Sequence, residues 1–250
     1  MKALVTGASS GIGLEIAKYL DELGYQLILV ARNKEKLEDL ASRLKHKAKI
    51  IVMDLETEAN IKSLYVLTKN EDIDILVNNA GFGDFGYFTE TDLNKELEMI
   101  DLNIKSVHML TKMFLKEMVK KDSGYILNVA SSASFQPGPL MATYYSTKAY
   151  VFRLTEAISY ELKKQKSKVH VSCLCPGPVD TNFNAVAGVN FAVKPLSKET
   201  VARYAVNQMF KNKMVIIPGF KMKCAKFFGR FLSDKKLMAI TYRIQKKKKN

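Results

Sequence analysis

The sequence of 250 residues contains no apolar run of about 20 residues, the length that a helix needs to cross the hydrocarbon core of a bilayer. We therefore expect no membrane-spanning helix. The first residues hold no basic segment followed by a long apolar one, and residues 2–6 have the pattern of a strand, so no signal peptide is expected. Cysteine is scarce, with only Cys173, Cys175 and Cys224, which is typical of a reducing compartment. Together these absences predict a cytoplasmic protein.

Clusters of metal-ligating residues are missing too. Cys173 and Cys175 alternate on a predicted strand, but no further ligand lies near them in the sequence, so no metal site is expected. The three histidines fall in no motif, and surface or packing roles are expected of them.

Positive charge is concentrated at the C-terminal end. Residues 221–250 contain eleven Lys or Arg and one acidic residue, Asp234, whereas the preceding 220 residues carry 28 basic and 24 acidic side chains. Because the main fold is nearly balanced, we expect it to bind no nucleic acid. Apolar residues such as Met222, Phe228 and Ile240 recur in the tail at helical spacing, which favours peripheral contact between residues 221–250 and an anionic membrane, at its inner face. The alternative is that the tail helices pack on the body or across a dimer.

Short apolar stretches alternate with segments of helical periodicity along the chain. The alternation predicts an α/β fold, a doubly wound parallel sheet of the Rossmann-like type with right-handed crossovers. One long helix, residues 93–121, is expected to bend or break near Leu102. We expect a single domain over residues 1–219 and a helical extension over residues 220–250. The seven predicted strands are residues 2–6, 26–31, 49–53, 73–77, 125–129, 169–174 and 214–217.

A glycine-rich segment joins the first strand to the first helix. Glycines at this point allow a tight turn and a close approach of the backbone to a pyrophosphate, and the helix N-terminus offers free N–H groups. The alternative is a plain strand-to-helix turn, which the following strand makes less convincing. The residues expected at this nucleotide site are Gly7, Ser9, Ser10, Gly11, Ile12 and Gly13.

The second strand ends at Ala31 and is followed by Arg32 and Asn33. An acidic residue there would bind the ribose hydroxyls of NAD, whereas a guanidinium can pair with a 2′-phosphate. The sequence therefore predicts that NADP(H) is preferred over NAD(H); the alternative is that Arg32 is a solvated surface residue. Residues expected beside the nucleotide after the third and fourth strands are Asp54, Leu55, Asn79, Ala80 and Gly81.

Tyr144 and Lys148 lie four residues apart on one predicted helix, so they share a face. The ammonium favours the phenolate, and we expect it to lower the pKa of the tyrosine until the phenol is a usable proton donor and acceptor near neutral pH. Combined with a nucleotide site, this pair predicts an enzyme that transfers hydride.

Six motifs in order give the chain a resemblance to the short-chain dehydrogenase/reductase family over residues 1–217. They are Thr6-Gly7-x-x-x-Gly11-Ile12-Gly13, Asn78-Asn79-Ala80-Gly81, Asn103, Ser131, Tyr144-x-x-x-Lys148 and Pro176-Gly177-x-x-x-Thr181. The resemblance implies a catalytic tetrad of Asn103, Ser131, Tyr144 and Lys148. Ser131 rather than Ser132 is chosen because it stands thirteen residues before Tyr144, the family's spacing. Tyr144 and Lys148 would also contact the coenzyme, as would Pro176, Gly177, Val179 and Thr181.

In the implied mechanism, Ser131 hydrogen-bonds the substrate carbonyl and Tyr144 supplies the proton as hydride arrives from the nicotinamide. Lys148 supports the phenol electrostatically and Asn103 positions a water. The expected activity is an NADP(H)-dependent interconversion of a carbonyl and a secondary alcohol. The alternatives are a non-catalytic nucleotide sensor or scaffold of the same fold and a membrane-surface module acting through its tail.

We expect a lipophilic substrate, such as a ketoacyl or steroid-like ketone. Its pocket would be built from Phe82, residues 131–135, Met141 and the apolar loop 182–195, which suits a cover over the site. The alternative is that the loop only packs on the body. A homodimer through the helices around Leu110 and Leu154 is favoured over a tetramer, because the tail differs from the usual C-terminus of the family.

Overall fold

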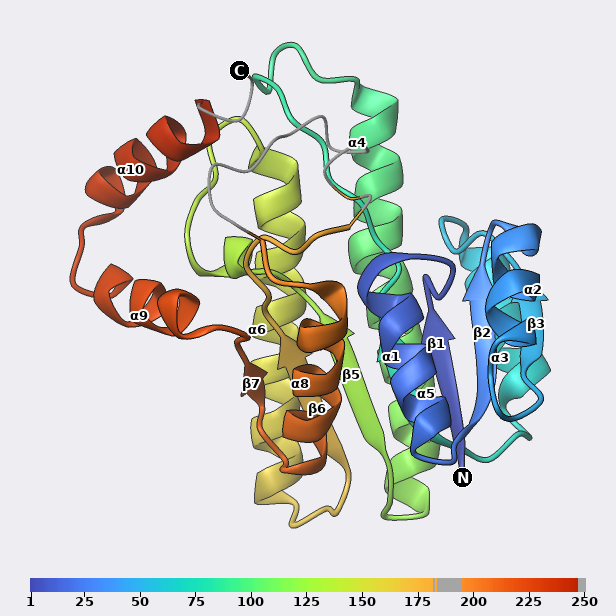
Figure 1. The fold of residues 1–250 in the computed structure, drawn as a ribbon. Helices are drawn as coiled ribbons and strands as arrows, with labels where there is room; N and C mark the ends of the chain where they lie inside the picture. The colour runs from blue at the N-terminus through green and yellow to red at the C-terminus, as the bar shows by residue number, and fades with distance from the viewer. Residues whose placement is uncertain (182, 184–194, 247–250) are drawn as a thin grey trace.

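The computed structural model describes residues 1–181, 183 and 195–246, and its centre is a sheet of seven parallel strands with helices on both faces (Figure 1). The predicted α/β, Rossmann-like architecture is therefore confirmed. The strands are β1 (Lys2–Thr6), β2 (Gln26–Ala31), β3 (Lys49–Val52), β4 (Ile73–Asn78), β5 (Tyr125–Val129), β6 (His170–Leu174) and β7 (Val215–Ile216). All seven predicted strands are present, although the last covers two residues instead of four.

The strand order is β3-β2-β1-β4-β5-β6-β7, and every pairing is parallel. The chain runs outward from β1 to β3, crosses back to β4 beside β1, and then continues in the other direction. Between β1 and β4 the connections leave to opposite sides, so a crevice opens at the carboxyl ends of these two strands. In doubly wound folds this switch point is where ligands bind.

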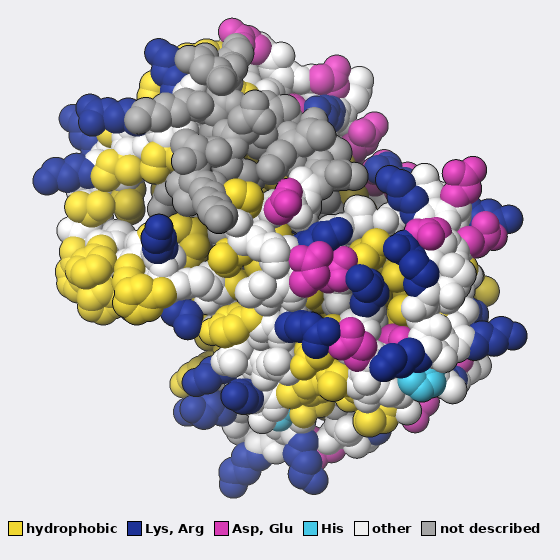
Figure 2. Space-filling model, in the orientation of Figure 1, with side chains coloured by type: hydrophobic (Ala, Val, Ile, Leu, Met, Phe, Trp, Pro, Cys, Tyr) yellow, Lys and Arg dark blue, Asp and Glu magenta, His cyan; other side chains and the backbone are white. Residues whose placement is uncertain are grey.

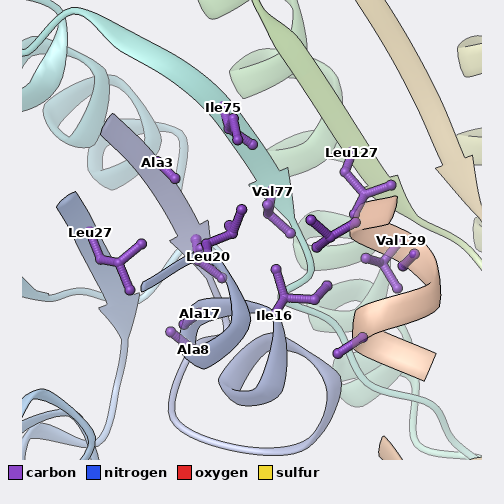
Figure 3. Close-up of a cluster of buried hydrophobic side chains, with 14 of the residues drawn as sticks. Ala3, Ala8, Ile16, Ala17, Leu20, Leu27, Ile75, Val77, Leu127 and Val129 are labelled. Atoms are coloured by element: carbon purple, nitrogen blue, oxygen red, sulfur yellow. The ribbon is translucent and has the colours of Figure 1, made fainter. Parts of the chain in front are cut away.

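Six helices cover the two faces of the sheet. The first face carries α1 (Gly11–Glu22), α2 (Lys34–Ser42) and α8 (Lys198–Phe210), and the second carries α3 (Glu58–Thr68), α5 (Val107–Lys120) and α6 (Ala142–Lys164). Alternate strand residues supply the two cores, as the period of two in a strand requires. On β1, Ala3 and Val5 pack toward α1, with Ile16 and Leu20 opposite (Figure 3), whereas Leu4 belongs to the other core.

The predicted long helix is interrupted. It consists of α4 (Leu93–Ile100), a π-helical segment η1 (Asp101–Ser106) and α5. The expected break near Leu102 is therefore confirmed, and its form is a widened turn that carries Asn103. π-Helical turns inside α-helices are frequent at functional sites because they redirect side chains.

After β7 the chain forms two further helices, α9 (Phe220–Gly229) and α10 (Asp234–Lys246), which lie on the outer side of the layered body (Figure 1). A 3₁₀ turn, η2 (Ser132–Phe135), follows β5 and contacts α9. In the part of the chain that the structure describes, no helix combines the length and the hydropathy that spanning a bilayer would require.

Candidate active site

The loop between β1 and α1 depends on its glycines. Gly7 and Gly11 have φ values of +64° and +58°, in the left-handed region that glycine adopts without strain. A Cβ on Gly13 would lie 2.3 Å from Nδ2 of Asn79 and 2.6 Å from the carbonyl oxygen of Gly7. The sequence predicted these glycines for a tight turn, which the structure shows; their close approach to a pyrophosphate stays a prediction.

Asn79 ties this loop to the end of β4. Its Nδ2 donates to the carbonyl oxygens of Thr6 and Gly7, each at 3.1 Å. The Thr6 hydroxyl in turn accepts from the backbone N–H groups of Asn79 and Ala80, at 3.0 and 3.1 Å. Asn79 was predicted at the coenzyme, and here it also shapes the glycine loop. Thr6 was quoted only as part of the motif, and its structural role was not predicted.

The N-terminus of α1 opens toward the crevice. Its N-cap residue, Ser10, makes no side-chain capping hydrogen bond, and the first turn of the helix contains no acidic residue. Its first N–H groups are therefore left for an anion, and the helix dipole favours negative charge there. The glycine cradle and this helix end together fit the pyrophosphate of a dinucleotide. The predicted residues Ser9, Gly11 and Ile12 all lie in this turn.

Arg32 follows β2, as expected, and is already paired. Its Nη1 lies 3.0 Å from Oε1 of Glu56 and 3.6 Å from Oδ2 of Asp54. Burial and the neighbouring Asp54 raise the pKa of Glu56, while the guanidinium lowers it. The Arg32 guanidinium is exposed but paired with two carboxylates, so it is not wholly free to bind a phosphate. The sequence analysis did not name Glu56 as its partner.

Two other residues predicted at the coenzyme, Asn33 and Leu55, stabilise the fold through their side chains. The Asn33 side chain caps α2 by accepting from the N–H of Lys36 at 2.8 Å. The Leu55 side chain is buried in the second core, so only its backbone could contact a ligand.

Tyr144 and Lys148 stand on the same face of α6, both nearly buried. The Lys148 ammonium lies 5.9 Å from the centre of the Tyr144 ring and donates to the carbonyl oxygen of Val129 at 3.0 Å. A Cβ on Gly81 would lie 3.3 Å from this ammonium and 2.6 Å from Oδ1 of Asn103. Gly81, predicted at the coenzyme, therefore leaves open the space beside the side chains of Asn103 and Lys148.

Asn103 is fully buried, and its side chain makes three hydrogen bonds. Its Nδ2 donates to the carbonyl oxygen of Phe82 at 2.9 Å and to the hydroxyl of Thr147 at 3.0 Å, and its Oδ1 accepts from the N–H of Phe82 at 3.1 Å. Thr147 was not predicted. Its position three residues after Tyr144, on the same helix, is the signal that could have identified it.

Ser131 is the N-cap of η2, where its Oγ accepts from the N–H of Ala133 at 3.1 Å. Its hydroxyl is close enough to the Tyr144 phenol to influence the titration of that phenol. The structure thus brings all four predicted tetrad residues to the carboxyl edge of the sheet.

Burial raises the pKa of Tyr144, and the smaller effect of Ser131 lowers it. Burial has the opposite effect on Lys148, because the charged form is the protonated one: it lowers the pKa of the ammonium to about 8. The expected depression of the tyrosine pKa by the ammonium is therefore wrong for this arrangement. The physical reason is that desolvation of the buried phenol is the largest influence on its pKa, while the ammonium is directed toward the Val129 carbonyl.

The segment after β6 packs against the glycine-rich loop. Thr181 packs against Gly11, where a Cβ would lie 3.3 Å from Cγ2 of the threonine. Val179 forms an isolated bridge with Leu196, and its side chain is buried in the first core. Pro176 accepts from the N–H of Ser132 at 2.8 Å. Gly177 faces the tail, because a Cβ there would lie 2.6 Å from Sδ of Met222.

An apolar cluster adjoins Tyr144 on the substrate side. It comprises Met99, Ala133, Met141 and Tyr144, with Phe82, Phe85, Tyr145 and Phe183 partly buried against it. The rings of Tyr144 and Phe183 are 5.3 Å apart. Phe82, Ala133 and Met141 were predicted here. The remainder of the predicted cover, with Val186, Val189, Phe191 and Val193, lies outside the described residues.

The tail also reaches this side. Nε2 of Gln245 donates to the Tyr145 hydroxyl at 2.6 Å, and Nε2 of Gln136 donates to the Thr241 hydroxyl at 2.8 Å. The hydroxyls of Tyr87 and Tyr242 are 2.9 Å apart. Hydrophobic periodicity predicted the tail helices, but it gave no signal for these polar contacts.

Among the residues that the structure describes, no group of three or more His, Cys, Asp or Glu side chains is arranged to hold a metal ion.

Comparison with known proteins agrees with this geometry. The family model described as short chain dehydrogenase matches residues 1–189. An uncharacterized oxidoreductase of Staphylococcus epidermidis is 37% identical over 212 residues, which are 82% of this chain and 90% of that protein.

Two solved structures superpose on most of the chain. A short-chain dehydrogenase from Sphingobium yanoikuyae in complex with NADPH is 27% identical, with a TM-score of 0.84 over 95% of each chain. A bulky-bulky ketone specific alcohol dehydrogenase from Comamonas testosteroni is 27% identical, with a TM-score of 0.79 over 88% of this chain and 86% of that one. The matches support a nicotinamide dinucleotide coenzyme and leave open whether it is NAD or NADP. The crevice, the tetrad and these relatives lead to one conclusion: the chain belongs to the short-chain dehydrogenase family of oxidoreductases.

Proposed function

We propose that the protein is an NADP(H)-dependent oxidoreductase that interconverts a carbonyl and a secondary alcohol on a lipophilic substrate. The observation that carries this proposal is the position of Tyr144 and Lys148. They share one face of α6, beside Asn103 and Ser131, at the sheet edge where the glycine cradle lies. A non-catalytic sensor of the same fold would not need this complete constellation.

When bound, the coenzyme supplies hydride exchange at its nicotinamide. Gly7, Gly11 and Gly13 would hold its pyrophosphate, and Lys148 its nicotinamide-side ribose. The Tyr144 hydroxyl donates a proton to the carbonyl oxygen of the substrate, and the Ser131 hydroxyl hydrogen-bonds the same oxygen while negative charge develops on it. Asn103, fixed by Phe82 and Thr147, keeps its polar end beside the Lys148 ammonium, where a water could return the proton.

Burial raises the pKa of the Tyr144 phenol, so its proton is retained near neutral pH and is present for transfer to a ketone.

Three features support NADP(H) as the coenzyme. Ala31 stands where an acidic residue would favour NAD, Arg32 follows it, and a relative of 27% identity was solved with NADPH. Because the guanidinium is shared with Glu56 and Asp54, a 2′-phosphate has to compete with carboxylates for it. The preference should accordingly be moderate.

A lipophilic substrate is supported by the apolar cluster around Tyr144. The cavity beside the tyrosine has a volume of only about 10 Å³ and is lined by Asp84 and Glu96 as well as by Met99 and Met141, so the support for a lipophilic substrate comes from the apolar cluster and not from this cavity. One of the similar structures is specific for bulky ketones. A ketone flanked by two apolar groups is the simplest substrate class for such walls.

We also propose a homodimer and contact between residues 221–250 and an anionic membrane. The side chain of Leu110 is buried in the core, so any contact by its helix would use neighbouring positions. Exposed apolar residues on two helices near α5 are Leu93, Leu97 and Ile100 of α4 and Tyr150 and Tyr160 of α6. Exposed apolar residues on adjoining helices are what a second copy of the chain would cover.

The direct test is a screen of ketones of increasing size with NADPH and NADH, following loss of the reduced coenzyme by absorbance. We expect turnover of bulky apolar ketones and a higher kcat/KM with NADPH. Absence of turnover with every ketone, despite measurable coenzyme binding, would favour the sensor hypothesis.

A further inference from the structure

The surface of α9 and of the turn that follows it is unusually apolar for an exposed element. None of the ten residues of α9 is buried. Phe220, Phe228 and Phe231 are 80%, 63% and 74% exposed, and Phe227 is also exposed. The Phe227 ring packs edge-on against Phe228 and Phe231, with centres 5.4 and 5.5 Å apart. We call Phe227, Phe228, Phe231 and Leu232 the aromatic patch; hydrophobic atoms gather in this region in Figure 2.

Basic residues flank the aromatic patch along the chain. Lys221 and Lys223 lie on α9, Arg230 directly follows that helix, and Lys235 and Lys236 lie in the first turn of α10. Asp234 is the one acidic residue of positions 221–250. Apolar side chains flanked by cations form the pattern with which interfacial helices enter an anionic bilayer: the rings reach the acyl boundary and the cations meet the headgroups.

The aromatic patch is not used in packing the tail on the body. Other residues of α9 and α10 make the contacts with the body. Met222 fills the space over Gly177, and the Lys226 ammonium lies 4.5 Å from the centre of the Phe135 ring. On α10, Thr241 and Gln245 are buried against Gln136 and Tyr145. The alternative of a tail that only packs on the body therefore explains these inner contacts and leaves the aromatic patch unexplained.

Other occupants fit this surface less well. In a symmetric contact with a second copy, two tails of net charge +10 would face each other, which is unfavourable at short range. A nucleic acid would satisfy the cations and could stack on the phenylalanines. It would leave Leu232 and the exposed Ile240 and Ile244 of α10 without an apolar partner.

We propose that the aromatic patch, together with Lys221, Arg230, Lys235 and Lys236, is a docking face for an anionic lipid bilayer. This deepens the membrane contact proposed above and does not depend on the reaction. The helix α10 contacts Gln136 and Tyr145, and Tyr145 is next to the catalytic Tyr144. A bilayer docked on α9 would lie beside α10, so a lipophilic ketone dissolved in the membrane has a short path to the site.

The experiment is flotation of the full chain with phosphatidylcholine vesicles and with vesicles that also contain phosphatidylglycerol. We expect binding to the anionic vesicles that weakens as salt is raised and little binding to phosphatidylcholine alone. A variant with Phe227→Ser, Phe228→Ser and Phe231→Ser should bind at least about tenfold more weakly. Val66→Ser with Leu67→Ser, a matched pair of exposed residues on α3, should bind like the unmodified chain.

Activity on a water-soluble ketone separates this inference from the proposed reaction. The triple variant should keep that activity and lose the advantage that anionic vesicles give toward a membrane-dissolved ketone. Equal vesicle binding by the triple variant and the unmodified chain would overturn the docking face. So would binding of a single-stranded oligonucleotide in preference to vesicles, or loss of an oligomer in the triple variant without any change in vesicle binding.

Discussion

Lys148 is buried near the ends of β5 and β6, and burial lowers the pKa of its ammonium to about 8 from its ordinary value of 10.5. In the unfolded chain the same group keeps its proton until near its ordinary pKa. Between about pH 8 and pH 10.5 the unfolded state therefore binds more protons than the folded state, and the free energy of unfolding rises with pH in this window.

The pH effect can be measured against Lys148→Met. Relative to that variant, the unmodified protein should gain up to about 3 kcal/mol in its free energy of unfolding as the pH rises through this window. Urea unfolding at several pH values, without coenzyme, measures the difference. A difference that is constant with pH, or that falls as pH rises, would contradict the buried, destabilised ammonium.

Arg32 decides coenzyme choice in this account. Replacing it with Asp should lower the ratio of kcat/KM with NADPH to that with NADH by about ten- to a hundredfold, since a charge-assisted hydrogen bond to the 2′-phosphate is lost. Glu56→Gln should raise the same ratio, because the Arg32 guanidinium would lose the carboxylate that lies 3.0 Å from it. Arg43→Asp, at the exposed end of α2, serves as the control, and an unchanged ratio in Arg32→Asp would refute the assignment.

The turn from β1 to α1 places the coenzyme cradle through its small residues. Gly13→Ala would put a methyl group 2.3 Å from Nδ2 of Asn79. We expect the loop to shift, coenzyme binding to fall below detection, and stability to drop by about 1–3 kcal/mol. Gly229→Ala, whose new methyl would lie 3.8 Å from Leu237, is the control. Titration of intrinsic tyrosine fluorescence with NADPH measures the binding, and normal affinity in Gly13→Ala would contradict the cradle.

Elements with strong periodicity could be predicted from the sequence. The strand Gln26–Ala31 is apolar and buried after its first residue because both faces of the sheet are covered, and the break at Leu102 was expected. The spacing of Tyr144 and Lys148 predicted their common helix face, whereas Asn103 and Ser131 were named only through the resemblance to the family. The pairing of Arg32 with Glu56 and the contact of Gln245 with Tyr145 could not, since both join residues that only the tertiary fold brings together. The raised pKa of Tyr144 escaped prediction for a related reason: its cause is burial, which spacing does not reveal.

Among the described residues, α4 and α6 expose apolar side chains, and so does α9. We assign the exposed side chains of α4 and α6 to a homodimer. Leu93→Glu with Leu97→Glu should yield a monomer in sedimentation velocity, because two charges would be buried in the interface. Val66→Glu with Leu67→Glu, also exposed but on α3, should leave the dimer intact. A dimer that survives the first pair of changes would place the interface elsewhere.

The most direct test of the whole account is the turnover of Tyr144→Phe with NADPH and a ketone substrate. The variant keeps the ring that packs on Phe183 and the apolar cluster, and it should fold and bind coenzyme normally. Without the proton donor, kcat should fall by about 10²–10⁴-fold while coenzyme affinity is unchanged. Full activity in this variant would contradict the assignment of Tyr144 as the proton donor.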